Sequence, residues 1–179
     1  DSLVGSEMCI RDSGYTAQAN MLLLEGALPH QVDQALENFG MSMGPFRMLD
    51  LVGLDLGWRA RKLSGAEPAL PSKIGDQLCE QDRFGQKNGR GFYNYSEGSR
   101  APNPAPENEE IYKAVSAANG IDRRDISDEE IIDRCILALV NEGADIIEEG
   151  VGQRAADLDV VYINGCLLYT SPSPRDYPG

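Results

Sequence analysis

The sequence has few histidines, cysteines and basic residues: one histidine and four cysteines among 179 residues, and 16 Lys and Arg against 29 Asp and Glu. The lone His30 excludes a metal centre with several histidine ligands and leaves one imidazole as a candidate base. The net charge of −13 argues against general binding to nucleic acid or anionic membranes, which requires basic surface. No apolar run approaches the roughly 20 residues of a membrane-spanning helix. Cys79 and Cys135, the two interior cysteines, lack CxxC spacing, so they indicate neither a disulfide framework nor a zinc site and favour a reducing compartment.

The two ends of the sequence match one another through their codons. Residues 7–13 can be encoded by GAG ATG TGT ATA AGA GAC AGN, and the reverse complement of these codons, read in another frame, encodes residues 166–171. We therefore interpret residues 1–13 and 166–179 as translated sequencing adapter. The alternative is a Leu-rich N-terminal arm and a Pro-rich tail. We expect residues 14–165 to be a fragment of a longer protein.

Hydrophobic periodicity predicts helices along most of this interior, and strand signals are almost absent. Pro29 and Gly40 mark the expected start and end of the second helix, and Ser127 with Glu130 forms a capping box for the last one. The expected helices cover residues 15–27, 29–39, 46–53, 54–63, 72–83, 107–119 and about 127–150. A glycine turn leads into a short extended aromatic piece that ends at Tyr95. The expected fold class is all-α.

The helices divide into two units, 14–95 and 107–165, joined by a Pro-containing linker over 96–106. The first and last long helices both end at Glu-Gly, which suggests related units; the alternative is that Leu-Glu-Gly is a common helix ending. We expect the apolar stripes of these two helices to contact each other in a pseudo-two-fold arrangement. The stripes are Ala19, Leu22, Leu23 and Gly26, and Ile132, Ile136, Leu139 and Ile147.

Few motifs in the interior carry chemistry. Gly89-Arg90-Gly91 precedes an extended segment and does not open a helix, so a structural turn is favoured over phosphate binding. His30 is expected to be exposed. Met43-Gly44-Pro45-Phe46 is either a helix-linking turn or the lining of a pocket. No nucleophile, base and orienting group assemble within 14–165.

Several motifs in order nevertheless resemble one family, the C-terminal domain of L-3-hydroxyacyl-CoA dehydrogenases. The tandem arrangement is similar to that of multifunctional β-oxidation enzymes, which fuse an enoyl-CoA hydratase/isomerase to the dehydrogenase. The motifs are Leu23-Leu24-Glu25-Gly26-Ala27, Val32-Asp33, Phe39-Gly40-Met41-Ser42-Met43-Gly44-Pro45-Phe46, Leu49-Asp50-Leu51-Val52-Gly53-Leu54-Asp55, Phe84-Gly85-Gln86-Lys87, Gly89-Arg90-Gly91-Phe92-Tyr93, Ile126-Ser127-Asp128-Glu129-Glu130-Ile131, Leu139-Val140-Asn141-Glu142-Gly143-Ala144, Glu148-Glu149-Gly150 and Asp157-Leu158-Asp159-Val160-Val161-Tyr162.

The resemblance implies hydride transfer from a 3-hydroxyacyl-CoA to NAD, which is bound by a Rossmann domain upstream of this sequence. The family's catalytic Ser, His, Glu and Asn belong to motifs that are absent here, so no catalytic or cofactor-binding residue is assigned and the fragment alone is expected to be inactive. Met43, Gly44, Pro45 and Phe46 are expected near the acyl path. Asn164, which stands where some bacterial relatives have a substrate-contacting Tyr, is a weaker candidate.

The partners implied are the acyl-CoA substrate, the missing Rossmann domain and a fused hydratase domain, with no nucleic acid and no membrane span. A bacterial protein of this kind would be cytoplasmic and a eukaryotic one peroxisomal. The alternative function, from another class, is a non-catalytic helical interaction or dimerisation module.

Overall fold

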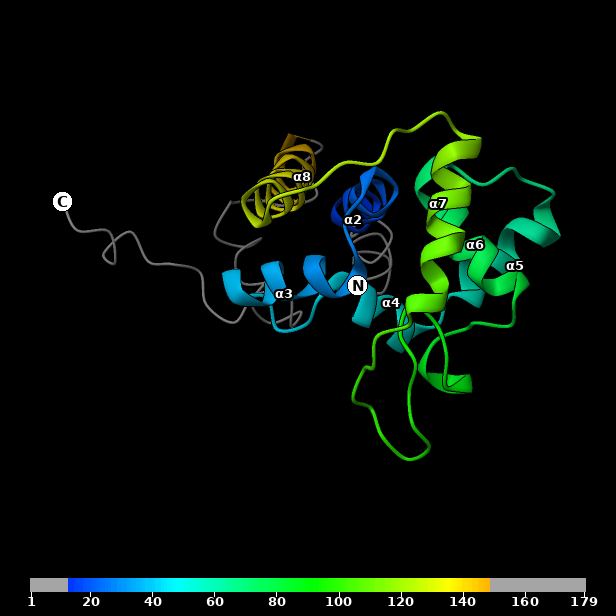
Figure 1. Cartoon of the computed structure of the whole chain (residues 1–179). Helices are drawn as coiled ribbons and strands as arrows, with labels where there is room; N and C mark the ends of the chain where they lie inside the picture. Colours follow the sequence, from blue (N-terminus) through cyan, green and yellow to red (C-terminus); the bar gives the residue numbers. More distant parts are fainter. Residues whose placement is uncertain (1–12, 149–179) are drawn as a thin grey trace, which may run out of the picture.

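The computed structural model describes residues 13–148, which form an all-helical structure with no β-strand in that range (Figure 1). This confirms the all-α fold class. The α-helices are α2 (Ser13–Glu25), α3 (Pro29–Phe39), α4 (Pro45–Val52), α5 (Asp55–Ser64), α6 (Lys73–Glu80), α7 (Glu109–Ala118) and α8 (Asp128–Glu148). Short 3-10 helices are η1 (Leu70–Ser72), η2 (Gln86–Asn88) and η3 (Pro106–Asn108). The expected extended aromatic piece pairs only through isolated bridges, such as the one between Asn94 and Asn103.

Helix α2 is the centre of the described structure. In Figure 1 it lies between α8 on one side and α7 on the other, and it contacts both as well as α4. Its sequence is apolar nearly all round, as is typical of a helix covered on every side. Ala19, Leu22, Leu23 and Leu24 are fully buried there.

The expected contact between the first and last long helices is confirmed, because α2 packs along α8 and Leu22 shares one core with Ile136. The most buried residues of α8 are, however, Ile131, Cys135 and Leu139. The buried face therefore lies one residue before the predicted Ile132 and Ile136 and agrees with the prediction at Leu139. Ile136 is only half-buried, because α8 also contacts α3 and its covered face is turned between the two helices. The side chain of Ile147 and everything after residue 148 lie outside the described residues, so the pseudo-two-fold arrangement stays a prediction.

The helices begin and end close to the positions predicted from proline, glycine and capping residues, with some differences. Helix α3 begins at Pro29 and ends before Gly40. Its periodicity predicts Phe39 on the apolar face with Val32 and Leu36, but Phe39 is the last residue of the helix and is 45% exposed, so that prediction is wrong. Half of the predicted capping box forms, since Ser127 Oγ accepts the Glu130 N–H at 3.2 Å. The Glu130 carboxylate instead pairs with Arg124 and Arg134.

The segment that leads into α8 crosses the C-terminal end of α2 and covers its last carbonyl groups. The Arg124 N–H donates to the Glu25 carbonyl at 2.7 Å, and the Arg123 guanidinium donates to the Leu23 carbonyl at 2.7 Å. A side chain at Gly26, which has φ +140°, would place its Cβ 2.0 Å from the Arg124 carbonyl oxygen. Glycine is therefore required where the two segments cross. Arg134 adds a bidentate ion pair to Glu25, at 2.7 and 2.9 Å, that joins α8 to α2.

Candidate substrate-binding turn

The turn before α4 is held by a carboxylate from the neighbouring helix α3. Asp33 accepts the backbone N–H groups of Phe46 at 2.9 Å and Arg47 at 3.1 Å, which would otherwise lack partners in the first turn of α4. Gly44 lies directly against this carboxyl group: a Cβ there would lie 2.3 Å from Asp33 Cγ. The Gly44 N–H donates to Glu37 Oε1 at 2.9 Å. Gly44 therefore allows the turn to close on α3.

The four predicted turn residues lie together but differ in exposure. Gly44, Pro45 and Phe46 are buried, and the Phe46 ring packs on Phe92 with 4.7 Å between ring centroids. Met43 is half-buried, so it is the one whose side chain reaches the surface. Asn164, the other predicted substrate-binding residue, lies outside the described residues.

A second buried carboxylate, Asp50 of α4, holds the aromatic segment that follows η2. It accepts the backbone N–H groups of Phe92 at 2.9 Å and Tyr93 at 3.0 Å, and the Tyr95 hydroxyl at 2.9 Å. Gly91 leaves room for it, because a Cβ there would lie 2.1 Å from Asp50 Oδ1. The predicted structural role of the Gly89-Arg90-Gly91 turn follows from this contact.

Tyr93 connects the two carboxylates. Its N–H donates to Asp50 and its hydroxyl donates to Asp33 Oδ2 at 2.7 Å. Sequence reasoning missed this network. The available signal was an acidic residue within each apolar helical face, Val32-Asp33 and Leu49-Asp50, followed later by closely spaced Tyr hydroxyl donors.

Burial dominates the electrostatics of both carboxylates, which are 3% and 0% exposed. Desolvation raises the pKa of Asp33 to about 7 and that of Asp50 to about 6, although the hydrogen bonds they accept oppose the shift. Within residues 13–148 neither carboxylate forms an ion pair with Lys or Arg. Burial likewise raises the pKa of the Tyr93 and Tyr95 hydroxyls, which keeps them as donors.

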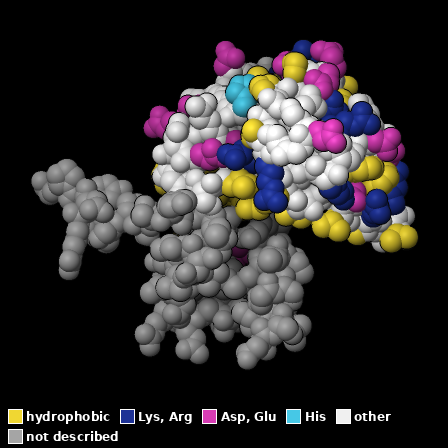
Figure 2. All heavy atoms as spheres, turned by 90° about the horizontal axis from the view of Figure 1, so that it is seen from below, with side chains coloured by type: hydrophobic (Ala, Val, Ile, Leu, Met, Phe, Trp, Pro, Cys, Tyr) yellow, Lys and Arg dark blue, Asp and Glu magenta, His cyan; other side chains and the backbone are white. Residues whose placement is uncertain are grey.

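A groove of about 310 Å³ runs beside this network, between α2, α4, α5 and η1. One of its lining residues, Phe92, packs on Phe46 of the turn, and the exposed Val52 and Leu56 also line it. Figure 2 shows hydrophobic side chains exposed along the lower edge of the described part. The residues that line the groove are Thr16, Ala17, Asn20, Leu49, Val52, Gly53, Leu54, Leu56, Gly57, Arg61, Pro71, Ser72, Gly75 and Phe92.

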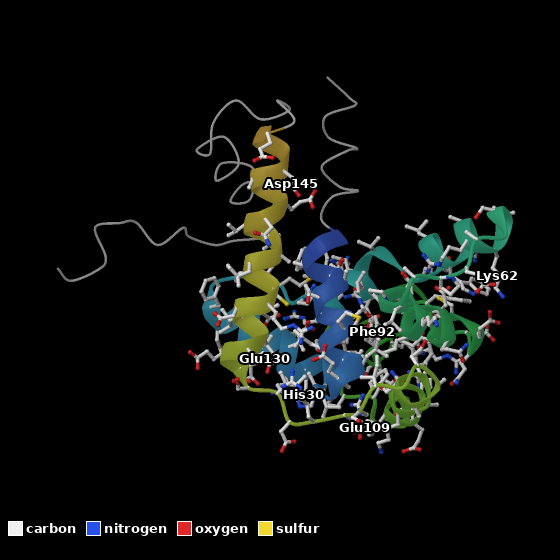
Figure 3. The ribbon with its side chains drawn as sticks, turned by 90° about the horizontal axis from the view of Figure 1, so that it is seen from above. His30, Lys62, Phe92, Glu109, Glu130 and Asp145 are labelled. Atoms are coloured by element: carbon white, nitrogen blue, oxygen red, sulfur yellow. The ribbon has the colours of Figure 1, made fainter. Side chains whose placement is uncertain are left out.

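His30 does not line the groove. It is exposed at the start of α3, as the sequence predicts (Figure 3). With Phe92, Tyr93 and Glu109 it lines a second pocket of about 100 Å³. No group of three or more His, Cys, Asp or Glu side chains that could hold a metal ion occurs in the described part. None of the described helices is both long and apolar enough to cross a membrane.

The described residues do not fit a nicotinamide dinucleotide. The Gly89–Gly91 turn is followed by an extended segment and closes on the Asp50 carboxyl group, which occupies the space beside Gly91. A dinucleotide site needs instead a glycine turn that opens a helix, whose N–H groups receive the pyrophosphate. No reaction step can therefore be derived through NAD from the residues described here.

Comparison with known proteins assigns the class of this fold. Residues 13–95 match the family model described as 3-hydroxyacyl-CoA dehydrogenase, C-terminal domain. The structure resembles the crystal structure of the dehydrogenase part of multifunctional enzyme 1 from C. elegans, with a TM-score of 0.71, 30% sequence identity, and coverage of 87% of this chain and 35% of that one. Residues 13–95 are thus similar to the C-terminal domain of 3-hydroxyacyl-CoA dehydrogenases.

More particularly, the chain is homologous to a region of peroxisomal bifunctional enzymes. It is 43% identical to the Danio rerio protein over 92% of this chain and 24% of that protein. It is 41% identical to the Homo sapiens protein over 84% of this chain and 23% of that protein. The chain thus spans about a quarter of the length of these curated relatives.

Proposed function

We propose that this chain is the C-terminal helical part of an NAD-dependent L-3-hydroxyacyl-CoA dehydrogenase of fatty-acid β-oxidation. In the intact protein the reaction would convert a 3-hydroxyacyl-CoA to a 3-oxoacyl-CoA, with NAD as the oxidant that would take up the hydride. The residues that bind NAD and the residues that carry the catalytic groups lie outside this chain. A eukaryotic protein of this type would act in peroxisomes and a bacterial one in the cytoplasm.

The observation that carries the proposal is an apolar groove beside α4, in a chain similar to this family. Hydride transfer needs a site that excludes water and orients the substrate, so an apolar wall beside the reacting atoms has a clear use. The groove supplies such a wall through Leu49, Val52 and Leu56. Met43, Gly44, Pro45 and Phe46 are proposed to lie along the acyl path, with Met43 as the contacting side chain and the other three as its support. Asn164 is proposed as a further contact.

Steady-state kinetics of the full-length protein that contains this chain test the proposal. We expect Met43→Trp, which adds bulk at the half-buried position, to raise the KM for a medium-chain 3-hydroxyacyl-CoA about tenfold while the KM for NAD stays unchanged. The matched control is Leu63→Trp, at a leucine 90% exposed near the end of α5, and it should leave both constants unchanged. An unchanged acyl-CoA KM in Met43→Trp would place the acyl path elsewhere.

A second measurement separates this proposal from the interaction-module alternative. The isolated chain is expected to produce no NADH from a 3-hydroxyacyl-CoA, whereas the full-length protein does so. A full-length protein that lacks this activity would support a non-catalytic helical module instead. Turnover by the isolated chain would contradict the assignment of the catalytic groups to residues outside it.

A further inference from the structure

The turn is fixed in space by Asp33, whose two carboxyl oxygens carry three separate hydrogen bonds. Oδ1 accepts the Phe46 N–H, and Oδ2 accepts both the Arg47 N–H and the Tyr93 hydroxyl. Since Gly44 also packs against this side chain without intervening space, a displacement of Asp33 displaces the turn.

Tyr93 is itself held in place by the second carboxylate, that of Asp50. Its N–H and that of Phe92 are bound to Asp50, and the Phe92 ring packs on Phe46 in the first turn of α4. The aromatic segment therefore approaches the turn twice, once through a ring contact and once through the Tyr93 hydroxyl. Both carboxylates are buried and neither has an ion-pair partner in the described part, although buried charges in proteins are usually paired.

We infer that Asp33 and Tyr93 are positioning residues for the turn Met43–Phe46, and that the relay from Asp50 through Tyr93 to Asp33 sets the place of Met43. The inference rests on the proposed function only where it assigns this turn to the acyl path. Asp33 and Tyr93 do not touch substrate in this scheme; they act through the backbone of the turn.

Proton binding to Asp33 changes the relay in a definite way. An ionised carboxylate only accepts hydrogen bonds, whereas a protonated one donates through one of its oxygens. A proton on Oδ1 weakens that oxygen as the acceptor of the Phe46 N–H. A proton on Oδ2 is accommodated if the Tyr93 hydroxyl rotates and accepts it. The hydrogen bonds to the turn are thus strongest when Asp33 is ionised and Tyr93 donates, whereas burial opposes the ionisation.

The charged groups around the relay do not neutralise it. Glu37 of α3 faces Asp33 and pairs with Arg47 at 2.6 Å while it accepts the Gly44 N–H. Arg83 faces Asp50 from the other side, but its guanidinium donates to the Gly91 carbonyl and pairs with Glu107. The Tyr93, Tyr95 and Tyr112 hydroxyls also face Asp50, and Tyr95 faces Asp33 as well. A change in Asp33 ionisation therefore reaches the turn directly.

Two matched Tyr→Phe variants of the chain test the relay by NMR. Tyr93→Phe removes the hydroxyl bound to Asp33 and keeps the ring, whereas Tyr95→Phe removes the hydroxyl bound to Asp50. In Tyr93→Phe we expect hydrogen exchange of the Phe46 and Arg47 amides to accelerate about tenfold, and the pH midpoint of their chemical shifts to rise. The midpoint rises because the lost hydrogen bond favoured ionised Asp33. In Tyr95→Phe, which loosens Asp50 but keeps the bond from the Tyr93 hydroxyl to Asp33, the Phe92 amide should respond most and these two amides less than in Tyr93→Phe.

Unchanged hydrogen exchange of the Phe46 and Arg47 amides in Tyr93→Phe would overturn the relay. An equal acceleration of these amides in both variants would overturn it as well, because that result signals a general loosening of the structure. The acyl-path part is read separately in the full-length protein, where Tyr93→Phe should raise the acyl-CoA KM several-fold with a smaller change in kcat. Amides that respond without this KM change would support the relay and overturn the placement of the acyl path at the turn.

Discussion

Replacing Gly44 by alanine measures how firmly the turn is closed on α3. Gly44 has φ −69° and ψ 154°, a conformation that alanine adopts without strain. The added methyl group, however, would lie 2.3 Å from Asp33 Cβ and Cγ and 2.4 Å from Oδ1. These are backbone-proximal atoms of a buried side chain, so Asp33 must move. The cost of the substitution is then the cost of displacing Asp33.

The magnitude follows from the hydrogen bonds that Asp33 makes. It accepts three, from Phe46, Arg47 and Tyr93, at 2.9, 3.1 and 2.7 Å. At about 1 kcal/mol net for each, their loss or distortion lowers the free energy of unfolding by about 2–4 kcal/mol. With a urea m-value of about 2 kcal/mol/M, the unfolding midpoint should fall by about 1–2 M.

Urea unfolding followed by far-UV circular dichroism is the assay, with Gly75→Ala as the matched control. Gly75 lies in α6 with nothing within 4 Å of its Cβ position, so alanine there should be neutral or stabilising by up to about 1 kcal/mol. In an Asp33→Gly background the Gly44→Ala substitution should cost less than about 0.5 kcal/mol, because both the clashing Cβ and the carboxyl group of residue 33 are absent. A wild-type midpoint for Gly44→Ala, or the same cost in both backgrounds, would refute the reasoning.

Three further outcomes are expected. Leu22→Ala should destabilise the chain by about 2–5 kcal/mol in urea unfolding, because Leu22 is fully buried between helices, whereas Leu137→Ala, at a position 58% exposed on α8, should stay within about 0.5 kcal/mol. Arg134→Ala should cost about 1 kcal/mol at low salt and less at high salt, since its ion pair is part-exposed; salt-independent loss would contradict an electrostatic contribution. The folded pKa values of Asp33 and Asp50 are raised to about 7 and 6, so between about pH 4 and 7 the folded chain binds more protons than the unfolded one. Their contribution to stability should therefore decrease as pH rises over that range; Asp50→Asn should flatten that slope, and an unchanged slope would show that Asp50 does not titrate there.

The helices could be predicted from the sequence because their signals are local. Proline and glycine fix backbone angles on their own, so the start of α3 at Pro29 and the glycine ends of α3 and α4 appear where expected. The facing of α2 and α8 could also be anticipated, since two apolar stripes need cover. The burial of Cys135 could not, because it depends on the packing of α8 against both α2 and α3.

For a related reason, the sequence indicated the turn of the candidate site but not the residues that support it. The turn residues Met43–Phe46 stand out as a motif, but their support comes from residues far along the chain. Asp33 and Tyr93 are 60 positions apart and meet through a single hydroxyl. Periodicity marks an aspartate on an apolar face as an exception without indicating which donors satisfy it. Only the three-dimensional arrangement pairs each buried carboxylate with its donors.

The pairing of Asn94 with Asn103 has a practical consequence for handling the protein. These residues exchange two backbone hydrogen bonds of 2.9 Å and so close the base of an exposed loop over residues 96–102. Downstream, the Ser116 hydroxyl donates to the Leu24 carbonyl at 2.7 Å, and α7 packs on α2 and α6. Both sides of the loop are thus anchored independently of its covalent continuity. The loop tip is accordingly the place to insert a fluorescent or affinity tag, and a chain nicked there by a protease keeps its two pieces bound to one another.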